Sequence, residues 1–472
     1  MGKLTRNYLF SSLTAGVRFF SNFILFIFIA RKLGIEEFGR LTLALSFTGI
    51  FLMIIDYGFR LQLIKDIAIA PDKALDIAKD FFNSKIIITI FSTIVLFTAV
   101  DIVAYPTETV IIIAILWFGS ILHSFAFFFN AIFKGLNKFH FETYPTIVLN
   151  ATQFFFITVL LYIEYKTVAI ALAMLVSRII YLVMSFYLVA REIGMFSFSF
   201  DFKRGIHVLM TSFPYGIHAI LSTLYLQIDT VFLSYFSGNA NVGVYQMAMR
   251  IVLATMIVNE IMVSSYFPII AKKLKSDIAG FRKDGIALNK YLLLIGGFAA
   301  VGLFVYAEYL IHFLYGSQYS SAIIILQMLS LVILIRFILT SYAAFITISG
   351  NQKLRSLSVA LSLLINIILN LYFIPLYGAR GAACTSIITH LFLLVLYFTF
   401  SLRMTQFSFI NAYWIKGFLM IGCLMPICLL LNTISIALSM VIFLILTVAI
   451  SVQILNLEEK VVIYGFIKRL LK

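Results

Sequence analysis

Four arginines lie deep inside long apolar stretches of this chain, where a charged side chain is costly. They are Arg18, Arg178, Arg250 and Arg336. Each costs about 2.5–3.5 kcal/mol at the centre of a membrane helix, so a partner or water must offset it. A guanidinium keeps its charge and donates paired hydrogen bonds to phosphate oxygens. We therefore expect these arginines to line a water-filled cavity that binds an anionic group. The alternative for each is a structural partner, either an acid or the carbonyls at a helix end.

Three acids and one histidine are the other candidates for chemistry within apolar stretches. Asp56, Asp229 and Glu260 could each carry H⁺ or Na⁺, or clamp an arginine, since burial sets the pKa of a carboxylate. His218 can change charge near neutral pH, and it lies in a stretch that we expect to line the cavity. A lone histidine in a membrane helix can equally be a hydrogen-bonded packing residue.

The elements that must position these groups are built for a lipid bilayer. The chain is 62% hydrophobic and 12% charged, which leaves too little polar surface for a soluble fold. A hydrocarbon core needs roughly 20 apolar residues per helix. Continuous apolar runs favour helices over an outer-membrane barrel, whose strands alternate. The sequence therefore predicts an all-α polytopic membrane protein with about 14 transmembrane helices. The expected spans are 8–30, 40–58, 84–104, 110–133, 144–163, 167–190, 208–232, 243–270, 291–313, 320–348, 357–375, 381–402, 412–431 and 435–455.

The distribution of basic residues predicts the orientation. The chain has 35 lysines and arginines. With the N-terminus in the cytoplasm, about 26 of them lie in or next to cytoplasmic connections, as the positive-inside rule requires. Both termini are then cytoplasmic. The first span lacks a small-residue cleavage site and is expected to be retained. The outer connections hold only Arg31, Lys32, Arg40, Lys166 and Arg380.

Several classes of function are disfavoured by the same features. Basic loops against an anionic leaflet explain the net charge of +15, so no nucleic-acid partner is expected. No GxxxxGK[ST] phosphate-binding loop is present, which argues against ATP hydrolysis. Cys384, Cys423 and Cys428 all fall inside spans without metal-ligand spacing. The sequence therefore predicts neither a cofactor nor a metal site.

The chain also repeats itself. Gly34 matches Gly238 at an offset of 204 residues, and segment 134–138 resembles segment 349–353 at an offset of about 215. We call these two internal sequence matches echoes. Because they occur in the same order along the chain, they predict duplication of a six-span unit. Six spans are an even number, so both halves keep the same topology and are related by an axis along the membrane normal.

This duplication predicts the domain organisation. The expected parts are an N-terminal lobe at 1–200 with spans 1–6, a C-terminal lobe at 201–405 with spans 7–12, and spans 13–14 with a cytoplasmic tail at 406–472.

Four segments together resemble one family of membrane proteins. They are ARKLGIEEFGRLTLALS (30–46), QIDTVFLSYFSGNANVGVYQMAMR (227–250), Pro268 at the end of span 8, and NLYFIPLYGARGAACTSIIT (370–389). In order and spacing they are similar to the Wzx-type polysaccharide-export flippases of the multidrug/oligosaccharidyl-lipid/polysaccharide exporter superfamily. The resemblance covers essentially the whole chain.

The resemblance implies both a fold and a function. The implied fold is a V-shaped pair of six-helix lobes around a cavity, with two extra helices that form a lipid groove in the lipid II flippase. The implied function is movement of an undecaprenyl-diphosphate-linked oligosaccharide to the periplasmic leaflet for O-antigen, capsule or another surface polysaccharide. Membrane lipids, and polymerase and chain-length proteins of the same pathway, are the implied partners. The family's aspartate in IDTVFL makes Asp229 as good a lobe-stabilising residue as a coupling one.

Two alternatives remain open. An ion-coupled drug or metabolite antiporter of the same superfamily would share the fold, but it would export organic cations and needs an acidic cavity. The surplus of arginine over acid within the spans argues against it. A membrane-embedded polysaccharide polymerase or ligase is the other alternative. Such an enzyme is expected to carry a sizeable periplasmic loop, and the outer connections here are short. We therefore expect a transporter and not an enzyme.

Energy coupling is predicted from the same acids. Without a nucleotide site, net movement must come from an H⁺ or Na⁺ gradient or from consumption of the product. A carboxylate that binds the ion differently in two cavity orientations would suffice. Asp56 and Glu260 hold matching positions near the cytoplasmic ends of the two lobes. They are either coupling residues or gate residues that pair with bases such as Lys65 or Lys272.

Overall fold

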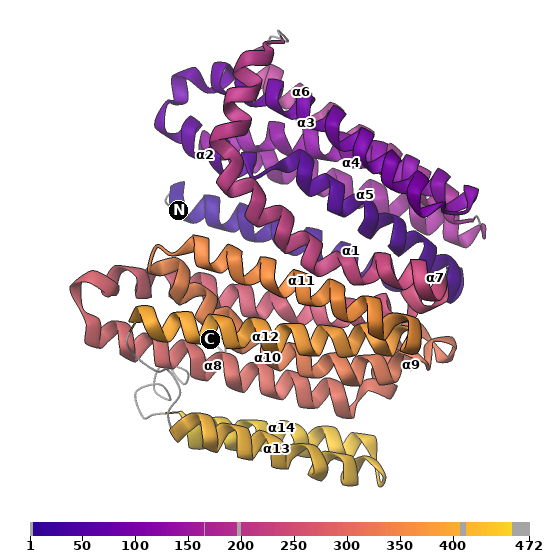
Figure 1. Ribbon diagram of the computed structural model, residues 1–472, viewed down its shortest axis with the longest axis vertical. Coiled ribbons are helices and arrows are strands. Elements are labelled where there is room, and N and C mark those ends of the chain that lie inside the picture. The colour runs from indigo at the N-terminus through magenta and orange to yellow at the C-terminus, as the bar shows by residue number, and fades with distance from the viewer. Residues whose placement is uncertain (1–2, 165, 196–199, 406–411, 456–472) are drawn as a thin grey trace. The chain divides into compact units, whose positions relative to one another are not determined.

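The computed structural model describes the chain apart from residues 1–2, 165, 196–199, 406–411 and 456–472, and the described part is helical throughout, without a strand (Figure 1). The helices are α1 (Lys3–Asp56), α2 (Phe59–Ile69), η1 (Pro71–Lys73), α3 (Ala74–Val103), α4 (Thr107–Gly135), α5 (His140–Tyr162), α6 (Thr167–Glu192), α7 (Phe202–Ser276), α8 (Ile278–Val305), α9 (Ala307–Tyr315), η2 (Ser317–Tyr319), α10 (Ala322–Ile348), α11 (Gln352–Tyr377), α12 (Ala379–Thr405), α13 (Ala412–Asn432) and α14 (Ile436–Ile454).

Twelve helical stretches of the described residues are long and apolar enough to cross a bilayer. Two of them are far longer than one crossing needs: Leu13–Asp56 has 44 residues and Ala219–Leu274 has 56. Each contains one break, at Gly34 and at Gly238, that divides it into two crossings. Twelve stretches, two of them double, correspond to the 14 expected spans, and the all-α polytopic fold is confirmed.

The two breaks have the same backbone conformation. Gly34 has φ 77° and ψ 174°, and Gly238 has φ 79° and ψ 171°. This positive-φ region is readily accessible to glycine alone. The two glycines are the pair that the 204-residue echo matches in the sequence. The echo therefore marks the same sharp turn between the first two crossings of each repeat.

The second echo also marks a shared turn, in a slightly different register. After α4, the N–H of Lys138 donates to the carbonyl of Phe133 at 2.8 Å, and after α10 the N–H of Asn351 donates to that of Ile346 at 3.2 Å. The residues in the left-handed conformation are Asn137, with φ 57°, and Gly350, with φ 76°. Both helices thus end in a glycine-type cap. The structural offset is 213 residues, because the cap aligns an asparagine with a glycine and not the two glycines.

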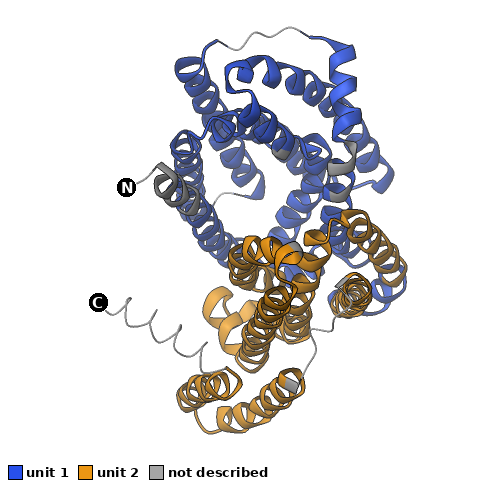
Figure 2. Cartoon of the chain, turned by 90° about the vertical axis from the view of Figure 1, so that its left-hand side faces the viewer, with its two compact units in different colours: residues 1–246, 370–379 blue, residues 247–369, 380–472 orange. Residues whose placement is uncertain are grey.

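The described chain forms two compact units (Figure 2). Unit 1 comprises residues 1–246 and 370–379. Within it α4 packs against α6, α1 and α2, and α5 packs against α1 and α6. Its apolar core near the start of α3 and the end of α4 includes Phe59, Phe81 and Phe133. Most of the polar residues described below lie on these helices.

Unit 2 comprises residues 247–369 and 380–472. Here α8 packs against α10, and α13 packs against both α14 and α8. Leu294 and Val301 of α8 share an apolar cluster with Leu424 and Ile450 of the last two helices. The hydroxyl of Tyr306 lies 3.0 Å from that of Ser439, which adds a polar contact to the same interface.

Candidate functional site

A polar cavity of about 150 Å³ lies inside unit 1 and brings two of the four predicted arginines together. Arg18 reaches it from the first half of α1, and Arg178 reaches it from α6. Helices α4 and α5 complete the wall. The other lining residues are Asn22, Phe26, Leu45, His123, Thr146, Leu149, Asn150, Gln153, Met174 and Tyr181. We call this the arginine cavity.

Arg178 is held by helix α4. Its Nη1 donates to the carbonyl oxygen of Leu116 at 3.2 Å and to the hydroxyl of Ser120 at 3.1 Å. Gly119 leaves room for the side chain, since a Cβ atom there would lie 3.1 Å from both Cδ and Nη1 of Arg178. A carbonyl inside α4, and not one at a helix end, thus satisfies part of Arg178. The guanidinium nevertheless still lines the cavity.

A second arginine joins Arg18 at an aromatic ring. The guanidinium carbon of Arg18 lies 5.5 Å from the ring centre of Phe127, and that of Arg60 lies 4.0 Å from it. Both distances fall in the range of cation–π attraction. The imidazole of His123 stacks on the same ring with centres 5.9 Å apart. The ring of Phe127 therefore contacts two guanidinium groups and one imidazole.

Glu142 is the acidic centre of the neighbouring group. Its carboxylate lies 3.4 Å from Arg60 and 2.8 Å from Lys134, and the residue is 2% exposed. Burial lowers the pKa of Arg60, and the carboxylate of Glu142 counteracts part of this shift. Glu142 thus gives Arg60 an ion-pair partner next to the arginine cavity.

Asp56 forms the second acidic centre. Its Oδ1 accepts from Nζ of Lys85 at 3.0 Å and from the hydroxyl of Ser124. Lys85 itself is 2% exposed. In this conformation the partner of Asp56 is thus a buried base of α3.

The two acidic centres and the arginine cavity together are strongly basic. Helix α4 links them: His123 lines the arginine cavity, the adjacent Ser124 donates to Asp56, and Phe127 contacts both Arg18 and Arg60. Five cations against two carboxylates leave a net charge of +3. The charged members are Arg18, Arg60, Lys85, Lys134, Arg178, Asp56 and Glu142. We call this set the basic cluster.

The other two predicted arginines belong to unit 2. Arg250 lies near Tyr315, and Arg336 lies near His390. The carbonyl of Arg336 accepts a hydrogen bond from Thr340 at 2.6 Å. A cavity shared by these arginines and Arg18 stays a prediction.

The remaining predicted residues have separate surroundings. Asp229 is 3% exposed and accepts hydrogen bonds from Tyr245 at 2.9 Å and from Asn370 at 2.7 Å. Glu260 is exposed. The side chain of His218 lies outside the described residues. The structure therefore joins Asp229 to two neutral donors, and the coupling roles of all three residues stay predictions.

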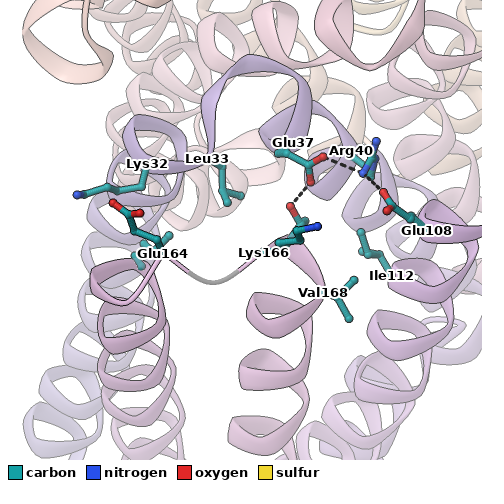
Figure 3. A pocket seen from close by; sticks show the side chains of 11 residues that line it. Lys32, Leu33, Glu37, Arg40, Glu108, Ile112, Glu164, Lys166 and Val168 are labelled. Carbon is teal, nitrogen blue, oxygen red and sulfur yellow. Dashed lines mark hydrogen bonds and ion pairs between the residues drawn. The ribbon is translucent and has the colours of Figure 1, made fainter.

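A larger pocket of about 500 Å³ lies where α1 breaks and where α4 and α6 begin. Arg40 bridges two acids there, with Nη1 at 2.8 Å from Glu37 and 2.5 Å from Glu108 (Figure 3). The hydroxyl of Thr167 also donates to Glu37. We call it the charged pocket. Its other lining residues are Lys32, Leu33, Ile112, Leu161, Glu164, Lys166 and Val168.

Four members of the basic cluster had not been predicted from the sequence: Arg60, Lys85, Lys134 and Glu142. One signal was available for Lys85. Asp56 ends the second crossing and Lys85 begins the third, and consecutive crossings bring such ends to the same side of the bilayer. For Arg60, Lys134 and Glu142, the helix ends alone do not specify a contact.

Known proteins place this chain in a family. Residues 4–273, more than half of the chain, match the family described as polysaccharide biosynthesis protein. A Shigella dysenteriae protein named as an O-antigen transporter is 23% identical over 401 residues, covering 83% of this chain and 98% of its own length. Its counterpart of the same name from Escherichia coli (strain K12) is 26% identical over 409 residues, covering 82% and 94%.

Solved structures confirm the fold. The lipid II flippase MurJ in an inward closed conformation superposes with a TM-score of 0.74 at 19% identity, covering 94% of this chain and 98% of MurJ. An inward-facing multidrug resistance transporter of the MATE family, from the MOP superfamily, gives 0.69 at 16% identity, covering 82% and 94%. The chain is a multi-pass membrane protein with this architecture, as its motifs indicated. By the match over residues 4–273, the protein belongs to the polysaccharide biosynthesis protein family.

Proposed function

We propose that this protein is a flippase for a lipid-linked oligosaccharide, moving an undecaprenyl-diphosphate-linked repeat unit from the cytoplasmic to the periplasmic leaflet by alternating access. The product would serve O-antigen, capsule or another surface polysaccharide. The observation that carries the proposal is the net charge of +3 of the basic cluster around the arginine cavity. The relatives named as O-antigen transporters support the same substrate class.

The chemistry of the cluster suits a diphosphate. Arg18 is exposed and Arg178 has only one of its nitrogens engaged by α4 in the contacts described above. A diphosphate offers several oxygens to planar guanidinium groups, which bind it by paired charge-assisted hydrogen bonds. Arg250 and Arg336 would meet the same group at a later stage of its passage. His218 is proposed to contact the diphosphate or the sugar.

The basic cluster disfavours the antiporter alternative. An exporter of organic cations needs a carboxylate that is free to attract its substrate, whereas Asp56 and Glu142 both contact lysine or arginine. Like charges around the cavity would repel a cationic drug. The same pairing disfavours a polymerase or ligase, since cations hold both carboxylates of the cluster and neither is free to act as a general base.

Energy coupling is proposed to use the acids of the membrane region. Lys85 supplies a positive charge to Asp56, so an external H⁺ or Na⁺ would compete with this internal cation. The competition would tie ion binding to breaking of the Asp56–Lys85 pair. We place the protein in the bacterial inner membrane with both termini in the cytoplasm, in agreement with its basic inner connections.

A flipping experiment tests the function. The full chain would be reconstituted in vesicles that contain undecaprenyl-diphosphate-linked oligosaccharide, and accessibility of the sugar to an external enzyme would report its translocation. Arg18→Ala and Arg178→Ala should strongly reduce flipping. Arg18→Lys and Arg178→Lys should retain only part of it, because lysine keeps the charge and loses the paired donors. Arg191→Ala is the matched control, because Arg191 is an exposed base at the end of α6 paired with Glu192. Equal flipping by all variants, at equal protein levels, would refute the diphosphate assignment.

A further inference from the structure

The charged pocket has a composition that topology alone does not explain. The outer connections expected from the sequence hold only five of the 35 basic residues. Three of these five, Lys32, Arg40 and Lys166, line this one pocket. Basic residues are disfavoured in outer connections by the positive-inside rule. The presence of three such bases in one pocket suggests that the pocket has a function of its own.

The charges of the pocket balance. Three acids, Glu37, Glu108 and Glu164, face the three bases. A phosphate would meet three carboxylates and a metal ion would meet three cations, so neither is favoured by the net charge. A neutral ligand with many hydroxyl groups is favoured, because each hydroxyl donates to a carboxylate and accepts from an ammonium or guanidinium group.

Part of this array is already fixed in position. Arg40 contacts both Glu37 and Glu108, and Thr167 contacts Glu37, so α1, α4 and α6 are tied together on one side (Figure 3). Lys32 and Glu164 are exposed and form no ion pair within the described part of the chain. The pocket thus combines a rigid side with charged groups that a ligand can still engage.

The pocket also offers apolar surface and sufficient room. Leu33, Ile112, Leu161 and Val168 line it between the charged groups. Aliphatic side chains can cover the C–H face of a sugar ring while its hydroxyls meet the charges. The volume of about 500 Å³ lies within the roughly 300–1,000 Å³ typical of small-molecule sites.

We propose that the charged pocket binds a neutral sugar unit of the glycan on the outer side of the N-terminal lobe. This proposal rests on the proposed function, since the sugar is that of the flipped repeat unit. The pocket lies beside the break at Gly34, at the opposite end of the first crossing from the N-terminus. Binding there would hold the emerging glycan on the outer side and disfavour its return.

Direct binding measurements on the full chain in nanodiscs test the proposal. The probes are the methyl glycosides of glucose, galactose, mannose, rhamnose and N-acetylglucosamine, measured by saturation-transfer NMR and titration. At least one should bind. Glu164→Ala and Lys32→Ala should each raise its dissociation constant about tenfold, as expected for loss of a charge-assisted hydrogen bond. Glu36→Ala is the control, because Glu36 is an exposed acid of α1 that does not line the pocket.

Three results would overturn the proposal. The first is that none of the five glycosides binds, and the second is that both pocket variants bind as the wild type does. The third is that glycerophosphoethanolamine binds instead, with the same dependence on Glu164, which would assign the pocket to a lipid headgroup. Flipping by the wild type separates the two hypotheses. Its absence would refute the proposed function, whereas normal flipping without sugar binding would refute only this inference.

Discussion

Gly39 and Gly243 lie back to back in unit 1, so that a Cβ atom on Gly39 would fall 2.9 Å from the backbone nitrogen of Gly243. The contact is reciprocal. A Cβ on Gly39 would overlap the carbonyl oxygen of Asn239, and one on Gly243 would overlap that of Ile35. Each pair is related to the other by the same 204 residues that relate the two halves of the sequence. The contact therefore has the local twofold relation that duplication predicts.

The first prediction follows from this contact. Gly39→Ala and Gly243→Ala should each destabilise the protein by about 1–3 kcal/mol, because the added methyl group must displace backbone. Thermal unfolding in detergent would measure the effect. Gly49→Ala is the control, since it lies in the same helix as Gly39 and has no atom within 4 Å of the Cβ position. It should leave stability unchanged or slightly higher. Equal behaviour of all three variants would contradict the close approach.

The second prediction concerns the Asp56–Lys85 pair. Asp56→Asn should destabilise by about 3–5 kcal/mol, because it leaves Lys85 charged and buried without its partner. Lys85→Met should cost less, since the Asp56 side chain is 29% exposed and can be hydrated. The double variant should recover much of the loss. Denaturation of the four proteins completes the cycle, with Asp101→Asn as a control on an exposed acid of α3.

The Asp56→Asn variant also distinguishes a coupling role of Asp56 from a gate role. Flipping would be measured in vesicles with an imposed pH or Na⁺ gradient. If Asp56 couples, Asp56→Asn should abolish dependence on the gradient while substrate still binds. If it is a gate residue, the gradient dependence should persist and the balance of inward- and outward-open states should shift. Glu260→Gln, at the exposed repeat position, should cost little stability in either case.

The third prediction concerns Asp229. Tyr245→Phe removes one hydrogen bond to its carboxylate and should cost about 1.5–3 kcal/mol. Asp229→Asn should cost a similar amount, because its amide nitrogen faces one of two hydrogen-bond donors. A lobe-stabilising role requires that folded Asp229→Asn protein keeps its response to ion gradients. Unchanged unfolding together with a lost response would instead make Asp229 a coupling residue.

The fourth prediction tests how α4 positions Arg178. Gly119→Ala and Gly119→Val add one and three carbon atoms where Arg178 passes, 3.1 Å away. Flipping should fall in that order although no charge is removed, because the guanidinium is displaced from the arginine cavity. Unfolding curves would show whether each variant is still folded. Flipping by folded Gly119→Val at the wild-type rate would show that the position of Arg178 does not matter.

Much of the fold could be predicted because it depends on local sequence. Apolar length predicts a crossing, and Gly34 and Gly238 mark turns that other residues disfavour. The offset of the second echo differs between sequence and structure, since Asn137 and Gly350 take the same cap position with different side chains. Sequence matching aligned the two glycines, whereas the backbone aligns the two left-handed residues.

The site was less predictable because it depends on which helices face each other. Arg18 and Arg178 stood out as charges in apolar surroundings. Arg60 did not, because it lies in the first turn of α2 outside any expected span and joins the cluster through Phe127 and Glu142. Lys85 lies at the start of an expected span, where the positive-inside rule is enough to explain a basic residue. The rule gave no reason to look for a partner of Lys85, although this lysine pairs with Asp56.

The two C-terminal helices make the halves of this duplicated protein mechanically unequal. Tyr306 at the end of α8 contacts Ser439 of α14, and Trp414 of α13 donates to Asn289 of α8 at 2.5 Å. Helices α13 and α14 must therefore travel with α8 as one body. A movement of α8 would then carry two additional helices through the lipid. If the two halves rock, as the proposed function requires, the half that carries these helices must displace more lipid than the other half.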